Sequence, residues 1–485
     1  MPVFRPVVKR VLATLLSLPT ILALSIALLL TACGGGGSTP SPPTPPPPPP
    51  NTKVWTWMSG ADTANAKGSY GTQGVAAAGN VPGGRWSAVS WIDTSGNLWL
   101  FGGNGLDSTG VCCLLNDLWE FNPTAKTWTW VSGSSTVNAI GVYGTEGVAS
   151  ASNVPGGRYA SVSWIDTSGN LFLFGGGGTN GLLNDLWEFG PTAKTWTWVS
   201  GSDAAGAIKG VYGTLGVASA SNVPGSRSNA VSWIDNNNNL WLFGGSGYDS
   251  FPLAGDLNDL WEFNPTAKTW TWVSGSSTVN AIGVYGTEGV AADSNVPGSR
   301  WNAVSWIDTS GNLWLFGGMG NDSTGTNGNL NDLWEFNPSA KTWTWVSGSS
   351  TANAQGVYGT QGVASASNVP GSRLAAVSWI DSSNNLWLFG GFNTGSGGPS
   401  EVLFNDLWEF NPTNKAWTWV RGANTGNASG VYGTQGVAAA SNVPGARGNG
   451  VSWTDSSGNL WLFGGNGLDS TGAGGNLNDL WRYQP

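Results

Sequence analysis

The sequence predicts an all-β protein that forms a closed ring of six similar sheets with four strands each. One segment of about 73 residues occurs six times, and its arginines are spaced by 73, 69, 73, 73 and 74 residues. These arginines are Arg85, Arg158, Arg227, Arg300, Arg373 and Arg447. Each copy contains four short apolar runs of strand character. A long repeat that fills a chain in this way indicates an array or a closed ring.

The first copy shows the four predicted strands in order. Trp86–Ile92 mixes small and large residues, and Leu98–Phe101 is continuously apolar up to a double glycine. Leu118–Phe121 and Thr127–Val131 alternate, so that their aromatic residues share one face. The polar segment Asn122–Lys126 has the composition of a turn. Four strands that each turn back on the last are expected to form an antiparallel meander.

The double glycine, the phrase N-D-L-W-E-F and the tryptophan of the fourth strand resemble the Kelch motif. The resemblance covers residues 54–483 and implies a six-bladed Kelch-type β-propeller around a central channel. The expected blades lie near residues 85–131, 158–199, 227–273, 300–346, 373–420 and 447–483. The repeats are longer than the roughly 50 residues of Kelch repeats. The histidine that is usual in the first strand of the motif is absent, because the chain has no histidine.

The ends of the repeat array predict how the ring closes. Val54–Met58 is a fourth strand without its first three, and Asn478–Tyr483 is a third strand without its fourth. We expect Val54–Met58 to complete the sixth blade, which leaves no open sheet edge. The propeller domain would then span residues 54–485. Of the 31 tryptophans, 29 fall in five recurring positions, where they are expected to pack blade against blade.

Residues 1–32 are expected to be a lipoprotein-type signal peptide. Three basic residues, Arg5, Lys9 and Arg10, precede an uncharged apolar stretch. Leu30–Cys33 resembles a bacterial lipobox. The alternative is a plain signal anchor, because the apolar stretch is long enough to span a bilayer.

The lipobox resemblance implies that Cys33 is acylated and holds the protein in a lipid bilayer of the bacterial cell envelope. Gly34, which is not aspartate, implies sorting to the outer membrane. Residues 33–53 are rich in glycine and proline and are expected to form a semi-rigid tether.

The net charge of the chain argues against nucleic acid as a partner. The leader holds three of the 19 basic residues and none of the 28 acidic ones, so the rest of the chain has a net charge of −12. A chain this acidic is not expected to bind nucleic acid.

Beyond residue 33 the only cysteines are the adjacent Cys112 and Cys113. They form no disulfide framework and are interpreted as incidental thiols in a variable loop.

Positions that break the repeat are the best candidates for specific recognition. The residues just after the arginines differ between copies, with Gly448 and Asn449 at this place in the sixth copy, and are expected to face the mouth of the channel. These candidate ligand-binding residues are Trp86, Tyr159, Ser228, Trp301, Leu374 and Asn449. Aromatic faces beside hydroxyl and amide groups suit a sugar or an apolar side chain. The alternative is that these residues have simply diverged without a role.

Each copy also carries an insert after the fourth strand, of which Gly141–Arg158 is one example. The insert is nearly identical in all six copies. We interpret it as structural, with six copies overlapping in a collar on the face of the long loops. A repeated binding surface is the alternative.

The loops after the second strand vary, and some are rich in Asp, Asn and Gly, as in Asn321–Gly325. Oxygen ligands on such a loop could hold calcium. The spacing of a calcium-binding loop is missing, however, so ordinary turns are favoured. No cofactor and no metal ligand are predicted.

No catalytic residue is predicted. Galactose oxidase carries its copper site on a Kelch-type propeller with histidines and tyrosines, and a chain without histidine cannot build that site. The recurring carboxylates are expected to be structural and to pair with arginines or backbone amides. They are Asp93, Asp117 and their copies, and the third-strand residues Glu120, Glu188, Glu262, Glu335 and Glu409.

Two functions follow from these observations. The first is a membrane-tethered, non-catalytic interaction module that binds an envelope protein or a glycan through the loops around the channel mouth. The alternative is a hydrolase or lyase that acts on extracellular polysaccharide through carboxylates at the mouth. A structural protein of the envelope or matrix is a third possibility.

Overall fold

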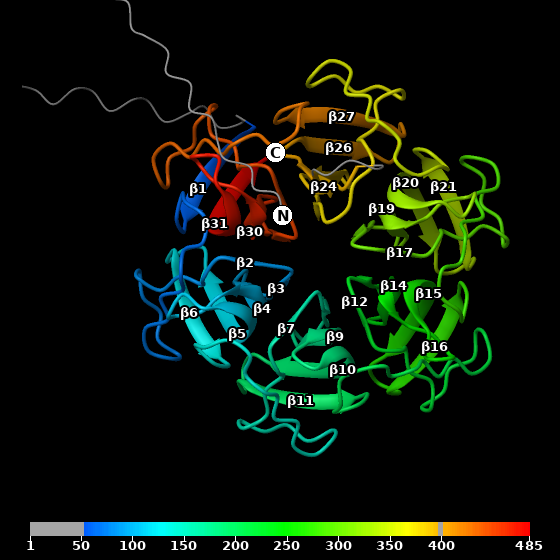
Figure 1. The fold of residues 1–485 in the computed structure, drawn as a ribbon, viewed down its shortest axis with the longest axis horizontal. Helices are drawn as coiled ribbons and strands as arrows, with labels where there is room; N and C mark the ends of the chain where they lie inside the picture. The colour runs from blue at the N-terminus through cyan, green and yellow to red at the C-terminus, as the bar shows by residue number, and fades with distance from the viewer. Residues whose placement is uncertain (1–52, 396–400) are drawn as a thin grey trace, which may run out of the picture. The chain divides into compact units, whose positions relative to one another are not determined.

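The computed structural model describes residues 53–395 and 401–485. The predicted signal peptide, Cys33 and nearly all of the tether lie outside the described residues. The described residues form six blades, each a β-sheet of four or five strands, arranged in a ring around a central channel (Figure 1). Every regular element in 53–395 and 401–485 is a strand, and none of these residues forms a helix long and apolar enough to cross a membrane. The predicted six-bladed, all-β propeller is therefore confirmed.

The first three blades have the same strand order. Blade 1 contains β2 (Arg85–Trp86), β3 (Val89–Ile92), β4 (Leu98–Leu106), β5 (Cys112–Asn122) and β6 (Thr127–Ser132). Blade 2 contains β7 (Arg158–Tyr159), β8 (Val162–Ile165), β9 (Leu171–Gly178), β10 (Gly181–Gly190) and β11 (Thr195–Ser200). Blade 3 contains β12 (Arg227–Ser228), β13 (Val231–Ile234), β14 (Leu240–Tyr248), β15 (Ala254–Asn264) and β16 (Thr269–Ser274).

Blade 4 keeps this strand order, whereas blade 5 has an additional separate strand pair and blade 6 is completed by the N-terminal strand β1. Blade 4 contains β17 (Arg300–Trp301), β18 (Val304–Ile307), β19 (Leu313–Asn321), β20 (Asn327–Asn337) and β21 (Thr342–Ser347). Blade 5 contains β22 (Val377–Ile380), β23 (Leu386–Phe389), β26 (Leu407–Asn411) and β27 (Ala416–Arg421), with β24 (Phe392–Asn393) and β25 (Val402–Leu403) as a separate pair. Blade 6 contains β28 (Arg447–Gly448), β29 (Val451–Thr454), β30 (Leu460–Leu468), β31 (Gly474–Gln484) and β1 (Val54–Ser59).

Two strand boundaries differ from the prediction. The first strand is broken in two, because Ser87 takes up a left-handed conformation with a φ of 50°. In the first blade, the second and third strands continue past the double glycine as a hairpin over Gly103–Leu115, where the sequence predicted a variable loop after the second strand. A bulge at the double glycine makes this possible: the φ of Gly103 is 94°, and a Cβ there would lie 2.8 Å from the carbonyl oxygen of Trp86.

The hydrophobic core lies between the blades. Six clusters of buried side chains each combine residues of two neighbouring blades. Between blades 1 and 2, Trp91 and Trp99 pack against Trp187 and Trp196. The indole nitrogen of Trp91 also donates a 3.1 Å hydrogen bond to the carbonyl oxygen of Phe172, and an equivalent bond crosses each of the other five interfaces. The predicted packing role of the recurring tryptophans is confirmed.

The ring closes as predicted. β1 pairs antiparallel with β31, with Val54 opposite Gln484 and Trp57 opposite Trp481. Trp55 is fully buried at this seam, and it packs against Trp379 of blade 5 and Tyr483 of blade 6.

The inserts are structural, but they do not form the expected collar on the loop face. Each insert runs along the outer strand of the blade that follows it, at the outside of the ring (Figure 1). In blade 1, the amide of Gly74 donates to the carbonyl of Trp130 at 2.7 Å, and the Asn80 side chain donates to the carbonyl of Trp128 at 3.1 Å. The inserts therefore cover the outermost strand edges, which would otherwise be open.

Candidate functional site

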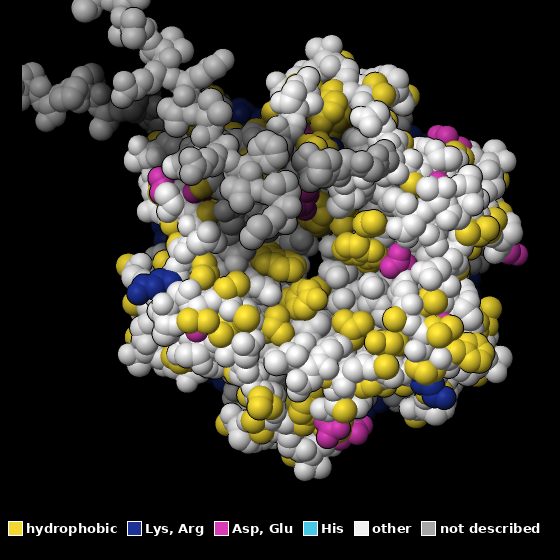
Figure 2. Space-filling model, in the orientation of Figure 1, with side chains coloured by type: hydrophobic (Ala, Val, Ile, Leu, Met, Phe, Trp, Pro, Cys, Tyr) yellow, Lys and Arg dark blue, Asp and Glu magenta, His cyan; other side chains and the backbone are white. Residues whose placement is uncertain are grey.

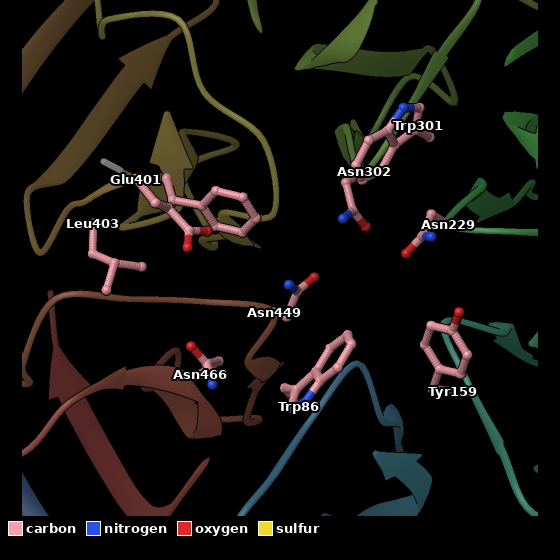
Figure 3. Close-up of a pocket in the computed structure, with 10 residues that line it drawn as sticks. Trp86, Tyr159, Asn229, Trp301, Asn302, Glu401, Leu403, Asn449 and Asn466 are labelled. Carbon is pink, nitrogen blue, oxygen red and sulfur yellow. The ribbon is translucent and has the colours of Figure 1, made fainter. Parts of the chain in front are cut away.

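A cavity of about 460 Å³ lies at one mouth of the central channel, and all six blades contribute to it (Figure 3). Its lining residues are Trp86, Tyr159, Asn229, Trp301, Asn302, Phe392, Glu401, Leu403, Asn449 and Asn466. Figure 2 shows hydrophobic side chains gathered around the central opening, with most charged side chains farther out on this face. The size is within the range of small-ligand sites, roughly 300–1,000 Å³.

Four of the six residues predicted for the mouth line this cavity: Trp86, Tyr159, Trp301 and Asn449. Ser228 and Leu374 do not, because they are 6% and 1% exposed. The amide of Leu374 donates a 3.0 Å bond to the carbonyl of Phe392, so the short pair β24–β25 covers it. The side chains of Ser228 and Leu374 therefore lie outside this lining.

Sequence reasoning missed the residues one position further along. Asn229 and Asn302 line the cavity, and both have φ values near 55°, at 57° and 51°. Asparagine tolerates this left-handed conformation better than most residues. An asparagine in three of the six copies, directly before the apolar part of the first strand, was the available signal.

The left-handed residues are joined in a closed ring of backbone hydrogen bonds. The amide of each residue donates to the carbonyl of its counterpart in the preceding blade at 2.8–2.9 Å. The members of this ring, called here the mouth ring, are Ser87, Ala160, Asn229, Asn302, Ala375 and Asn449. Because every amide and carbonyl in the ring is used, the three asparagine side chains project from a rigid backbone.

A second closed ring of hydrogen bonds lies deeper in the channel. The hydroxyl of Ser90 donates to the carbonyl of Ser452 in the preceding blade at 3.2 Å. The corresponding serines repeat the bond around the channel, at 2.9–3.2 Å. The two rings hold the six blades together at the axis, so the cavity stands on a fixed frame.

The aromatic side chains give the cavity its shape. The rings of Trp86 and Tyr159 meet edge to face, with centroids 5.6 Å apart and planes at 64°. Figure 3 shows these two side by side, with Trp301 and Asn302 on another side of the cavity. Flat apolar faces and side-chain amides therefore surround the same space.

Basic groups are close in sequence but do not reach the cavity. The guanidinium of Arg85 binds both carboxylate oxygens of Asp117 at 2.7 Å, and both side chains are buried. Burial opposes the charge on Arg85, but the neighbouring Asp117 outweighs it and raises the pKa of the arginine. All six blades contain this pair. The predicted structural pairing of Asp117 and its copies with arginine is confirmed.

In the oxygen-rich loop Asn321–Gly325, the side chain of Asp322 is held by backbone amides. One carboxylate oxygen of Asp322 accepts from the amides of Thr324 and Thr326 at 2.7 and 2.9 Å, and the other accepts from Ala352 at 2.9 Å. Burial raises the pKa of Asp322, but these hydrogen bonds outweigh it and lower the pKa below its usual value. In 53–395 and 401–485, no three acidic or cysteine side chains gather closely enough to hold a metal ion.

Cys112 and Cys113 lie at the start of β5, exposed and without a disulfide bond. Partial burial and the neighbouring Cys113 raise the pKa of the Cys112 thiol. A raised pKa leaves less of the reactive thiolate at neutral pH.

Comparison with known proteins matches the middle of the ring. Residues 217–427 match the family described as KLHDC2/KLHL20/DRC7 Kelch-repeats domain. No curated protein matches the chain. The matched segment contains all the strands of blades 3, 4 and 5. The six-bladed all-β ring and this match together support a Kelch-type β-propeller, a fold that indicates a protein-interaction module.

Proposed function

We propose that this protein is a non-catalytic binding module that takes a glycan into the mouth cavity. One observation carries the proposal: four aromatic side chains from four blades share the cavity with the asparagines of the mouth ring. The apolar face of a sugar ring can stack on an aromatic side chain while its hydroxyls bond to amides. A Kelch propeller by itself suggests protein binding, and it is this lining that favours a glycan.

The alternative of a polysaccharide hydrolase or lyase gains no support from the lining. Glycoside hydrolysis ordinarily uses two carboxyl groups placed about 5–10 Å apart across the scissile bond. Among the described residues, Glu401 is the one carboxylate that lines the cavity. A single carboxylate provides either an acid or a base, not both at once.

The membrane attachment is part of the same proposal. Its support is the resemblance of Leu30–Cys33 to a lipobox and the glycine- and proline-rich segment that follows. Acylation of Cys33 would place the binding module at the cell envelope on a semi-rigid tether. Mass spectrometry of the protein isolated from membranes, which would show a lipid-modified Cys33, tests this part.

Substitution of the aromatic lining tests the binding proposal. The chain from Asn51 to Pro485 is titrated with a panel of soluble oligosaccharides and followed by calorimetry. We expect Trp86→Ala or Trp301→Ala to weaken the best ligand about tenfold, since a well-stacked ring contributes up to about 1.5 kcal/mol.

Phe251→Ala is the matched control, because Phe251 is an exposed aromatic residue, 67% accessible, outside the cavity lining. It should leave the affinity unchanged. Equal affinity of the Trp86→Ala, Trp301→Ala and unaltered proteins would contradict the proposal. Turnover of an oligosaccharide by the purified protein would favour the enzyme instead.

A further inference from the structure

We infer that the mouth cavity selects glycans that carry ammonium groups over neutral and anionic glycans of the same backbone. This inference rests on the proposed function and adds the charge class of the ligand. It follows from the charges that surround the cavity and from the aromatic side chains that line it.

The cavity lining contains one charged residue, and it is acidic. None of the ten lining residues is Lys or Arg, and Glu401 supplies the single carboxylate. The hairpin pairs next to the mouth add one further acid, Asp256, and no base. These pairs are Asn104–Leu114, Gly177–Leu182, Ser246–Asp256, Met319–Asn329, Phe392–Leu403 and Asn466–Asn476.

The six arginines that directly precede the mouth positions do not offset this negative character. Each is about 1% exposed, and its guanidinium is bound on two nitrogens by an aspartate of the same blade. An anionic sugar in the cavity would therefore lose water without gaining a positive partner, which is costly.

The aromatic lining adds an attraction for positive charge. An ammonium group over the face of Trp or Tyr is attracted by the negative face of the ring. Figure 3 shows Glu401 on the side of the cavity opposite Tyr159, with Trp86 and Trp301 on further sides. A glycan that crosses the cavity would thus place ammonium groups near a carboxylate at one side and near aromatic faces at the others.

Three oligosaccharides that share one backbone test the inference: an oligomer of glucosamine, its fully N-acetylated form and an oligomer of glucuronic acid. Binding is measured by calorimetry at mildly acidic pH, where the sugar amines carry their charge. We expect the glucosamine oligomer to bind about two- to fivefold more tightly than the neutral form, as for an ion pair exposed to water. The glucuronic acid oligomer should not bind. Raising the salt to about 0.5 M should weaken only the cationic ligand.

Substitution of the carboxylate separates this inference from the proposed function. Glu401→Gln should remove the preference, so that the cationic and neutral oligomers bind this variant with equal affinity. Glu146→Gln makes the same charge change on an exposed insert at the outside of the ring and should keep the preference.

Equal affinity for the cationic and neutral oligomers, or a preference that survives Glu401→Gln, would overturn the inference while the proposed function stands. Absence of binding to any glycan would overturn both.

Discussion

Asp259 illustrates how a single buried carboxylate holds one blade together. It accepts hydrogen bonds from both terminal nitrogens of Arg227 at 2.7 Å, from the Tyr212 hydroxyl at 2.6 Å and from the Trp261 indole at 2.7 Å. These partners lie in the first strand, the insert and the third strand. Burial and the neighbouring Asp259 raise the pKa of Tyr212, so its hydroxyl stays a donor.

We expect Asp259→Ala to lower the free energy of unfolding by about 3–5 kcal/mol, because it leaves the Arg227 guanidinium buried without a counter-charge. Denaturant unfolding followed by tryptophan fluorescence measures the change. Asp203→Ala removes an exposed aspartate and is the control, which should stay within about 0.5 kcal/mol. A loss below about 1 kcal/mol for Asp259→Ala would show that water enters and solvates the arginine.

The residues at the channel mouth were predicted from the sequence only in part. The repeat identified the variable positions after each arginine, and four of the predicted residues line the cavity: Trp86, Tyr159 and Trp301 directly after the arginine, and Asn449 one residue further along. It could not identify Leu374 as buried, because that depends on how the hairpin of blade 5 folds back over it. Asn229 and Asn302 were missed because the break in the first strand depends on hydrogen bonds between blades, which no local pattern records.

The third strands carry a row of half-buried glutamates at the blade interfaces. In blade 2, burial raises the pKa of Glu188, Asp166 raises it further, and Lys268 of the next blade lowers it in part. The same balance raises the pKa of Glu120, Glu262 and Glu335. The carboxyl groups of these glutamates therefore bind their protons more tightly in the native state than in the unfolded chain.

We expect Glu188→Gln to leave stability unchanged below about pH 4 and to stabilise the protein at pH 7. A raised native pKa means that stability is lost as the pH rises from the unfolded value through the native one, and glutamine does not titrate. Thermal unfolding at both pH values measures this. Glu288→Gln, on an exposed insert, is the control. A less stable Glu188→Gln protein at pH 7 would mean that the attraction of Lys268 outweighs the burial of Glu188.

The inserts show what element-level prediction lacks. Near-identity of the six copies indicated a structural role, and their hydrogen bonds confirm it. Their position along the outer strands was not predicted, because their partners there are the backbone carbonyls of residues such as Trp128 and Trp130. A backbone carbonyl is present at every residue, so the sequence does not mark which ones are used.

The ring as a whole depends on the pairing of β1 with β31. The number of blades and this closure could both be predicted from the sequence. The repeat gives the number of blades, and the incomplete repeats at its two ends show that they must complete each other. The closure matters for stability, since β1 covers the outer edge of β31 and supplies the buried Trp55 to the interface between blades 5 and 6.

A chain that starts at Gly60, and so lacks β1, should lose more stability than the roughly 3–5 kcal/mol of one buried tryptophan. It should also associate through the exposed edge of β31. Denaturant unfolding and light scattering measure the two effects. A chain that starts at Lys53 is the control and should behave as the unaltered protein. A monomeric, equally stable chain from Gly60 would show that the ring closes without this strand.

The pairing of β1 with β31 also distinguishes the two ends of blade 6. Val54 pairs with Gln484 at one end of β31, whereas Asn476, eight residues earlier on that strand, pairs with the cavity residue Asn466. Eight residues of strand span about 26 Å. The polypeptide therefore joins the propeller on the side away from the cavity. The end of blade 6 that receives the first residue of β1 is therefore not the end that would receive the glycan.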